Sequence, residues 1–176
     1  DLLHSVFGLQ AFRPGQSEIV ARLLARQNTL VVMPTGAGKS LCYQVPALVF
    51  QNLTIVVSPL VALMDDQVAA LRALGVDAAC IHSGRDRDAN VADWKRVQGG
   101  ACKLLYMSPE RLMTARMIQA LQKLDPDMFV VDEAHCISKW GMNFRPEYEA
   151  LSGLKEAFPS AVFSAFTATA DEATRR

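Results

Sequence analysis

Residues 33–40, Met-Pro-Thr-Gly-Ala-Gly-Lys-Ser, follow the apolar run of residues 29–33 and carry side chains suited to binding phosphate. A strand that ends in Gly-x-Gly-Lys-Ser and continues as a helix is typical of a phosphate-binding loop. Glycine lets successive backbone N–H groups converge on one anion, and the helix start adds the positive end of its dipole. The lysine reaches the terminal phosphates of a nucleotide, and the serine offers its hydroxyl to a magnesium ion. The predicted nucleotide-binding residues in this loop are Thr35, Gly36, Ala37, Gly38, Lys39 and Ser40.

The loop departs from the strict pattern at one position, because Met33 stands where a glycine is usual. An ordinary glycine-rich turn between a strand and a helix is the alternative interpretation. The strand before the loop and the helix after it favour the nucleotide site.

Asp132 and Glu133 follow a second apolar run, residues 128–131, and open the tetrapeptide Asp-Glu-Ala-His. Two acids at the end of a buried strand repel each other and lose hydration, and a cation relieves both costs. We therefore expect Asp132 and Ser40 to hold magnesium, and Glu133 to orient or deprotonate an attacking water. The alternative is that the two acids only cap the helix that follows.

Apolar runs of strand length alternate with helical stretches along the chain. Because these runs are continuous, the strands are expected to be covered on both faces, as in a mostly parallel sheet sandwiched by helices. Ligands of such α/β folds bind beyond the carboxyl ends of the strands, where both motifs fall. The predicted strands lie near residues 29–33, 54–58, 78–82, 103–107, 128–132 and 161–165. The predicted helices lie near residues 15–27, 38–50, 60–74, 86–98, 109–124 and 146–158.

The composition is that of an ordinary globular protein, with 51% hydrophobic and 20% charged residues among 176. This length predicts one domain with one substantial core. Eighteen basic residues balance eighteen acidic ones, so contact with nucleic acid must come from local placement of charge. No apolar run approaches the ~20 residues that cross a bilayer, and no secretory leader opens the chain. We expect a cytosolic protein without membrane contact.

The four cysteines lack the spacing of metal ligands and lie in or beside apolar segments (Cys42, Cys80, Cys102 and Cys136). This pattern predicts buried, reduced thiols. His4 and His82 stand apart from other candidate ligands, and surface positions are expected for both.

Two predicted strands end alike, at Ser58 and at Ser108, and each serine is followed by proline. Serine as the N-cap and proline at the first helical position are a favourable helix start, which is a sufficient structural explanation. The further interpretation is that N–H groups at both helix starts line up along a nucleic-acid backbone, with Lys103 and Arg111 nearby.

Trp140, Phe144 and Arg145 occupy a loop that contains glycine, asparagine and proline and that directly follows the acidic motif. Aromatic residues in such a loop either cover the edge of a core or stack on unpaired bases. Thr167 and Thr169 close the last predicted strand, where they either cap a helix or face the same edge of the sheet as the other motifs.

These motifs, in this order, resemble those of the RecQ family of DNA helicases, and the resemblance covers essentially the whole chain. The aromatic loop directly after Asp-Glu-Ala-His separates this family from RNA-unwinding relatives that have the same box. The matching segments are an adenine-recognising motif (12–16), the phosphate loop (33–40), two strand-tracking motifs (57–68 and 104–112), the catalytic box (132–135), the aromatic-rich loop (140–148) and a coupling motif (166–170).

The resemblance implies that residues 1–176 form a RecA-like P-loop NTPase domain, the first of two motor domains in an ATP-dependent DNA helicase. It implies Mg²⁺ and ATP as cofactors, movement 3′ to 5′ on DNA, contact with single-stranded and duplex DNA, and roles in DNA repair and recombination. Gln16 would read the adenine with Arg13 beside it, and the catalytic residues would be Lys39, Asp132, Glu133 and His135. The residues implied in DNA binding or coupling are Ser58, Ser108, Trp140, Phe144, Arg145, Thr167 and Thr169.

The chain departs from the family pattern at Leu9, where an aromatic residue is frequent, and at Met142 and Asn143, which replace a usual His-Asp pair. It opens without methionine and stops at Arg176, before any second motor domain with its arginine finger, so an excised and poorly active fragment is expected. Two other interpretations stay open. One is an RNA helicase of the same superfamily, and the other is a nucleotide-gated nucleic-acid-binding module with weakened ATPase coupling.

Overall fold

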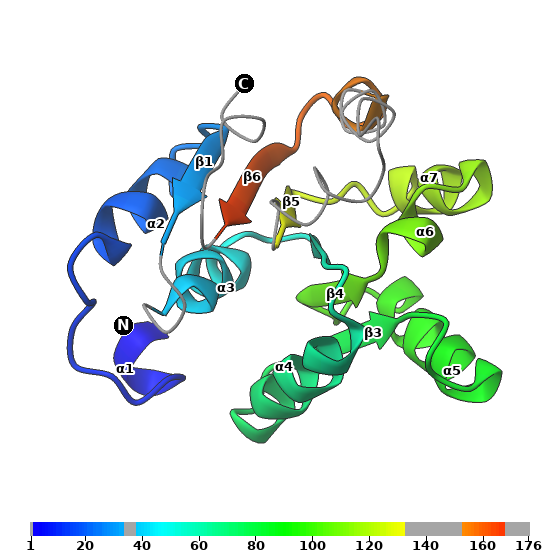
Figure 1. Ribbon diagram of the computed structural model, residues 1–176, viewed down its shortest axis with the longest axis horizontal. Coiled ribbons are helices and arrows are strands. Elements are labelled where there is room, and N and C mark those ends of the chain that lie inside the picture. The colour runs from blue at the N-terminus through cyan, green and yellow to red at the C-terminus, as the bar shows by residue number, and fades with distance from the viewer. Residues whose placement is uncertain (1, 34–37, 133–152, 168–176) are drawn as a thin grey trace.

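The computed structural model describes residues 2–33, 38–132 and 153–167. Six parallel strands form one sheet, and helices lie on both of its faces (Figure 1). The predicted fold class, an α/β domain with a parallel sheet between helices, is confirmed. No helix in the described ranges combines the length and the apolar character required to cross a bilayer.

The strand order in the sheet is β1-β6-β5-β2-β4-β3, and every neighbouring pair is parallel. The last strand along the chain therefore lies between β1 and β5. All six strands were predicted, and the largest difference is that β6 runs two residues past the expected end. Their bounds are β1 (Thr29–Val32), β2 (Thr54–Val57), β3 (Ala78–Ile81), β4 (Leu104–Met107), β5 (Met128–Val131) and β6 (Val162–Thr167).

The helices follow the expected alternation with one correction. The single helix predicted over 109–124 is wrong, because Thr114 starts a new helix by accepting a hydrogen bond from the Met117 N–H at 3.1 Å. A short helix at the N-terminus was not predicted, and residues 153–157 are the described helical part of the stretch expected near 146–158. The helices are α1 (Leu2–Ser5), α2 (Gln16–Leu24), α3 (Lys39–Val49), α4 (Val61–Ala73), α5 (Arg87–Gln98), α6 (Pro109–Leu112) and α7 (Ala115–Gln122).

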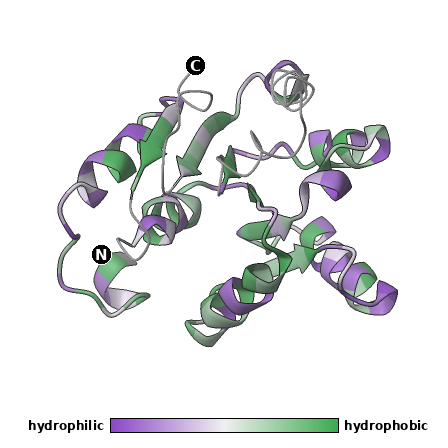
Figure 2. Ribbon diagram, viewed as in Figure 1, coloured by the Kyte–Doolittle hydropathy of each residue, from purple (hydrophilic) through white to green (hydrophobic). Residues whose placement is uncertain are grey.

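Two apolar layers hold the helices to the sheet. On one face, α2, α3 and α4 pack side chains such as Leu23, Tyr43 and Met64 against the strands. On the other face, α5, α6 and α7 pack residues such as Val97 and Leu121 against the same strands. Figure 2 shows this division, with apolar strands in the centre and mixed polar and apolar helices around them.

The expectation that every strand is covered on both faces is wrong for β1. This strand is an edge strand, and Leu30 and Val32 on one of its faces are 48% and 49% exposed. Val31, on the opposite face, packs in the core beside α2 and α3 and is only 5% exposed. The face of β1 that carries Leu30 and Val32 is not covered by any element of the described ranges.

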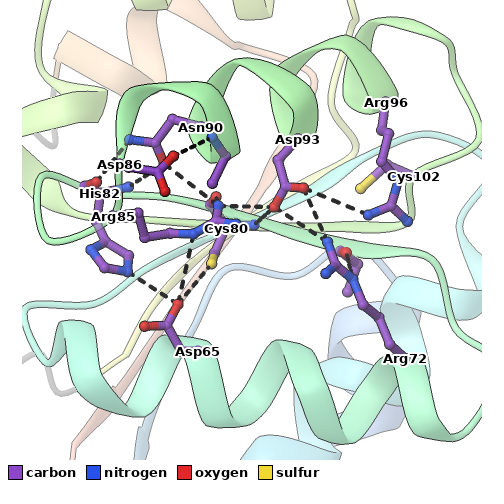
Figure 3. A network of polar contacts seen from close by, with 12 residues as sticks. Asp65, Arg72, Cys80, His82, Arg85, Asp86, Asn90, Asp93, Arg96 and Cys102 are labelled. Carbon is purple, nitrogen blue, oxygen red and sulfur yellow. Dashed lines mark hydrogen bonds and ion pairs between the residues drawn. The ribbon is translucent and has the colours of Figure 1, made fainter.

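Side chains close the other edge of the sheet, along β3 (Figure 3). An edge strand presents unpaired backbone groups, which invite pairing with another chain. Here the Cys80 N–H donates to Asp93 Oδ2 at 3.0 Å, and Arg72 Nε donates to the Ala78 carbonyl at 2.9 Å. Arg85 donates to the Cys80 carbonyl. The outward backbone groups of β3 are thus paired with side chains from both flanking helices and the connecting loop.

Asp93 is the centre of this edge network. It is 5% exposed, and its carboxylate lies 3.1 Å from Arg72 Nη2 and 3.0 Å from Arg85 Nη1. Because Arg72 belongs to α4 and Asp93 to α5, the ion pairs join the helices of opposite faces around the end of the sheet.

The surface position expected for His82 is wrong. Its side chain is 3% exposed, and its Nε2 lies 3.2 Å from Asp65 Oδ1. Its Nδ1 accepts a hydrogen bond from the Gly84 N–H at 3.0 Å. Burial of Cys42, Cys80 and Cys102 is confirmed, and each is a free thiol.

Candidate nucleotide site

Lys39 and Asp132, predicted from two separate motifs, meet at the carboxyl edge of the sheet. Lys39 is the first residue of α3, and Asp132 directly follows β5. Lys39 Nζ lies 3.4 Å from Asp132 Oδ1, and the two side chains are 16% and 14% exposed. The lysine that starts α3 and the acid at the end of β5 therefore lie side by side at this edge of the sheet.

Strand β6 lies between β1, which precedes the phosphate loop, and β5, which precedes Asp132. Met33, at the start of the phosphate loop, donates its N–H to the Thr167 carbonyl at 3.0 Å. Asp132 donates its N–H to the Val57 carbonyl of β2 at 2.8 Å. Thr167 is fully buried. Met33, Thr167 and Asp132 are thus joined to the same sheet by ladder hydrogen bonds.

Gln16 connects the predicted adenine-recognising segment to the phosphate loop. Its Oε1 accepts from the Arg13 N–H at 2.6 Å, and its Nε2 donates to the Gly38 carbonyl at 2.9 Å. The side chain is only 2% exposed. An amide has two acceptor lone pairs and two donor protons, so one acceptor site and one donor proton of Gln16 have no hydrogen-bond partner within residues 2–33, 38–132 and 153–167. Reading of adenine by Gln16 and Arg13 stays a prediction.

Gly38 must be glycine in this arrangement. Its φ of 77° lies in the left-handed region, where a side chain is strained. A Cβ at this position would also collide with Gln16 Nε2. The last glycine of the loop is therefore required by its own backbone and by the glutamine that it contacts.

The donor set at the site suits a hard divalent cation. Asp132 offers a carboxylate, and the half-buried Ser40 is the second residue of α3, next to Lys39. Oxygen ligands of these two kinds are the ones that magnesium prefers, with phosphate oxygens and waters completing the shell. Binding of Mg²⁺ by Ser40 and Asp132 stays a prediction.

A buried polar cluster that the sequence did not reveal lies under the site. The Tyr106 hydroxyl is within hydrogen-bond distance of the Tyr43 hydroxyl at 3.3 Å and accepts from Gln44 Nε2 at 3.2 Å. Burial raises the pKa of Tyr106 to about 12, the two hydrogen bonds lower it in part, and the charge of Asp132 raises it. Tyr106 is therefore neutral at physiological pH and helps to fix α3, which carries Lys39.

The two serine-proline strand ends differ from each other. Ser108 is the N-cap residue of α6, with proline at the first position, but its Oγ makes no capping bond and has no hydrogen-bond partner in the described ranges. Ser58 is not an N-cap, because α4 begins only at Val61 after the cap residue Leu60. Instead, Ser58 Oγ accepts from the Leu60 N–H at 3.2 Å and shapes the turn before the helix. Both serines are buried, and DNA contact by either one stays a prediction.

Several predicted site residues lie outside the described ranges. They are Thr35, Gly36 and Ala37 of the phosphate loop, Glu133 and His135 of the catalytic box, Trp140, Phe144 and Arg145 of the aromatic loop, and Thr169. Their roles stay predictions.

Asp65, Cys80 and His82 place three possible metal-ligand atoms within 4.8 Å of one another. The Gly84 N–H, however, occupies the lone pair of His82 Nδ1. The proton of the neutral ring then resides on Nε2, which donates it to Asp65 and has no lone pair for a metal. The arrangement is a hydrogen-bonded part of the edge network rather than a metal site.

The comparison with known families agrees with this geometry. The profile described as DEAD/DEAH box helicase matches residues 13–176. The chain belongs to that family. The match includes residues 13–16 of the segment predicted to recognise adenine, the phosphate loop and the acidic box of this DEAD/DEAH box helicase domain.

Curated relatives of this helicase domain carry the name RecQ. It is 48% identical over 176 residues to the ATP-dependent DNA helicase RecQ of Pasteurella multocida, covering 100% of this chain and 28% of the relative. It is 49% identical over 175 residues to the protein of the same name from Haemophilus influenzae, covering 99% of this chain and 28% of that relative. The chain thus spans less than a third of the length of these relatives.

Solved structures share the fold at low sequence identity. The DUF1998 helicase MrfA, solved with DNA and AMPPNP, superimposes with a TM-score of 0.78 at 20% identity over 96% of this chain and 26% of that one. A hypothetical ATP-dependent RNA helicase from Sulfolobus tokodaii gives a TM-score of 0.72 at 20% identity over 96% of this chain and 50% of that one. At this identity the likeness extends to the fold alone.

Proposed function

We propose that this chain is the ATP-binding motor domain of a RecQ-type, ATP-dependent DNA helicase that unwinds DNA in the 3′ to 5′ direction. The observation that carries the proposal is the 3.4 Å contact between Lys39 Nζ and Asp132 Oδ1 at the carboxyl edge of a parallel sheet. Because the ammonium and the carboxylate lie this close together, little movement is needed to replace their mutual contact by contacts with a triphosphate and its metal ion.

Each residue of the site has a separate task. The ammonium of Lys39 neutralises the terminal phosphates, and the N–H groups at the start of α3 add the positive end of the helix dipole. Asp132 and Ser40 would hold Mg²⁺, which neutralises developing charge on the phosphates when bound. Glu133 orients the attacking water, and His135 transmits the state of the site to Thr167 and Thr169.

The preference for DNA over RNA is supported by the relatives that match the chain along its length. Those from Pasteurella multocida and Haemophilus influenzae are named DNA helicases, at 48% and 49% identity. The RNA helicase likeness is a likeness of fold at 20% identity. We therefore assign DNA as the substrate, with Ser58, Ser108, Trp140, Phe144 and Arg145 along its path and a second motor domain of the same protein as partner. A protein of the bacterial cytosol or nucleoid, or of a nucleus, follows from that substrate.

The decisive experiment uses Lys39→Ala in the full-length protein. We expect ATP affinity to fall at least tenfold and DNA-stimulated hydrolysis to fall by about 10² or more, because the terminal phosphates lose their cation. Lys95→Ala, on the exposed side of α5, is the matched control and should retain both properties. Unchanged ATP affinity and turnover in Lys39→Ala would contradict the proposal.

The substrate is decided by the same assay in the wild-type protein. Stimulation of hydrolysis by single-stranded DNA but not by RNA is the expected result, and the reverse would point to an RNA helicase. Nucleotide-dependent DNA binding without any stimulated hydrolysis would instead identify a gated binding module.

A further inference from the structure

A pocket of about 360 Å³ lies between α5 and the α6–α7 segment, and neither Lys39 nor Asp132 lines it. Its apolar walls come from Ile81, Trp94 and Met117, and its cationic side chains are Arg87, Arg111 and Arg116. This volume is at the lower end of the ~300–1,000 Å³ typical of small-ligand sites.

The three arginines leave their charge available. Each is exposed, and they come from three different elements, α5, α6 and α7. None of them forms an ion pair with another residue in the described part of the chain, and no carboxylate is among the residues that line the pocket. In a chain whose formal net charge is zero, this is a local concentration of unpaired cations. The pocket is therefore prepared for an anionic ligand.

The pocket also has an aromatic wall. Trp94 is half-buried and packs with one part against the apolar core below α5, while it lines the cavity with another. An indole with an accessible face binds flat rings and cations by stacking. The ligand that suits the pocket thus combines negative charge with a flat or apolar group.

The position of the pocket relates it to the proposed DNA path. Arg87 follows the carboxyl end of β3, and Arg111 follows the carboxyl end of β4. These strand ends lie on the same edge of the sheet as Asp132 after β5, because all strands are parallel. At about 4.8 Å per strand, β4 and β3 are roughly 10 and 15 Å from β5. Arg111 also belongs to the segment 104–112 that resembles a strand-tracking motif.

We propose that this pocket receives one nucleotide of single-stranded DNA at the outer end of the strand-tracking segment. The base stacks on Trp94, and the flanking phosphates contact Arg87, Arg111 and Arg116. The proposal rests on DNA as the substrate of the domain, and it adds a nucleotide-binding position that α5 and α7 form. A nucleotide suits the site better than an acidic peptide, because it carries a flat ring and flanking phosphates in one unit and because Arg111 of the segment 104–112 lines the pocket.

The test measures binding of fluorescein-labelled oligo(dT) to the full-length protein. The oligonucleotides are about 4 to 16 nucleotides long, the range of site sizes known for single-strand-binding OB-folds. The variants are Arg87→Ala/Arg116→Ala and Trp94→Leu, and Lys95→Ala is the control on the same helix outside the pocket. Exposed arginines contribute little to folding, so the double variant is expected to fold. Its affinity for the longest oligonucleotide should fall roughly tenfold, and its salt slope should decrease by about 0.7 for each phosphate that an arginine no longer neutralises. The shortest oligonucleotides, which do not reach the pocket, should bind as they do to the wild type.

A second readout locates the base directly. Oligo(dT) with 5-iododeoxyuridine should cross-link to Trp94 on irradiation, and this product should disappear in Trp94→Leu. Wild-type affinity and salt slope in the double variant, together with no cross-link to Trp94, would overturn the proposal. If the same variant then failed to bind an acidic, aromatic-containing peptide that the wild type binds, the pocket would belong to a protein partner instead. If the wild-type protein showed no ATP-dependent DNA binding at all, the proposed function itself would be contradicted. That outcome differs from a change that is confined to the pocket variants.

Discussion

Gln16 Nε2 donates a hydrogen bond of 2.9 Å to the Gly38 carbonyl, across 22 positions of the sequence. The first residue of α2 is thereby attached to the last glycine of the phosphate loop. Binding of a base by the amide of Gln16 would therefore be coupled to binding of phosphate by the loop, because Gln16 and Gly38 are hydrogen-bonded to each other.

The first prediction concerns Gln16→Glu. The carboxylate still accepts from the Arg13 N–H but cannot donate to Gly38, and it introduces a charge at a position that is 2% exposed. We expect ATP affinity to fall by about tenfold, or ~1.4 kcal/mol. Nucleotide titration with ATP and GTP provides the measurement. A selective loss of ATP binding would show that the amide reads adenine. An equal loss for both nucleotides would show that Gln16 has only a structural role in supporting the loop.

The second prediction concerns Gly38→Ala. The added methyl group meets Gln16 Nε2, and the backbone has a φ of 77°. We expect a loss of at least 1–2 kcal/mol in unfolding free energy and a large loss of nucleotide affinity. Gly75→Ala is the control, since its φ is 84° but nothing lies within 4 Å of the added carbon. If both variants lose the same stability, the contact with Gln16 is of no consequence.

The third prediction concerns the closed edge of β3. Asp93→Ala removes the acceptor of the Cys80 N–H and leaves Arg72 and Arg85 without their buried partner. We expect the free energy of unfolding to fall by about 2–4 kcal/mol. Urea denaturation measures this, with Asp88→Asn, an exposed acid on the same helix, as the control. Size-exclusion chromatography should also show self-association of Asp93→Ala, because an open edge pairs with other chains; a monomeric and stable variant would contradict the assigned role.

The fourth prediction concerns alkaline pH. Burial is the largest cause that raises the thiol pKa of Cys42 to about 11 and those of Cys80 and Cys102 to about 12, from an ordinary value of 9.0. Below pH 9 both the folded and the unfolded chain keep these protons. Above it the unfolded chain releases them first, so stability falls between about pH 9 and pH 12, by up to ~1.4 kcal/mol per pH unit for each thiol.

Urea unfolding at pH 8 and pH 10 tests this dependence. Cys102→Ala should be less stable at both values, because it leaves a small cavity, but should lose less stability between them than the wild type does. An equal loss in the wild type and the variant would rule out Cys102 as a source of the pH effect.

The sequence predicts the strands well because each is a continuous apolar run. It places Lys39 and Asp132 at one edge of the sheet because both motifs follow strands, while the chemistry of the site stays a prediction. It does not predict that β6 lies between β1 and β5, since strand order depends on contacts that no local pattern records. Thr114 as a cap residue inside an otherwise helical stretch was the missed signal for the break between α6 and α7.

The edge network was missed for a different reason. Arg72, Asp93 and Arg96 look like the solvated face of ordinary amphipathic helices, and only the neighbouring β3 edge buries the carboxylate among them. His82 was expected at the surface because its partner Asp65 lies 17 positions away. The pocket arginines were equally hidden, although Arg87, Val91 and Trp94 have the i, i+4, i+7 spacing of one helix face.

The position of β6 inside the sheet affects the folding of the protein during its synthesis on the ribosome. Among the described strands, β1 pairs only with β6, and β6 pairs on its other side with β5. Until residues 162–167 have emerged, no strand can join the piece that carries Lys39 to the piece that carries Asp132. A shorter nascent chain contains Lys39 and Asp132 but lacks the strand that joins β1 to β5. We therefore expect nucleotide binding only after the whole sheet has been synthesised.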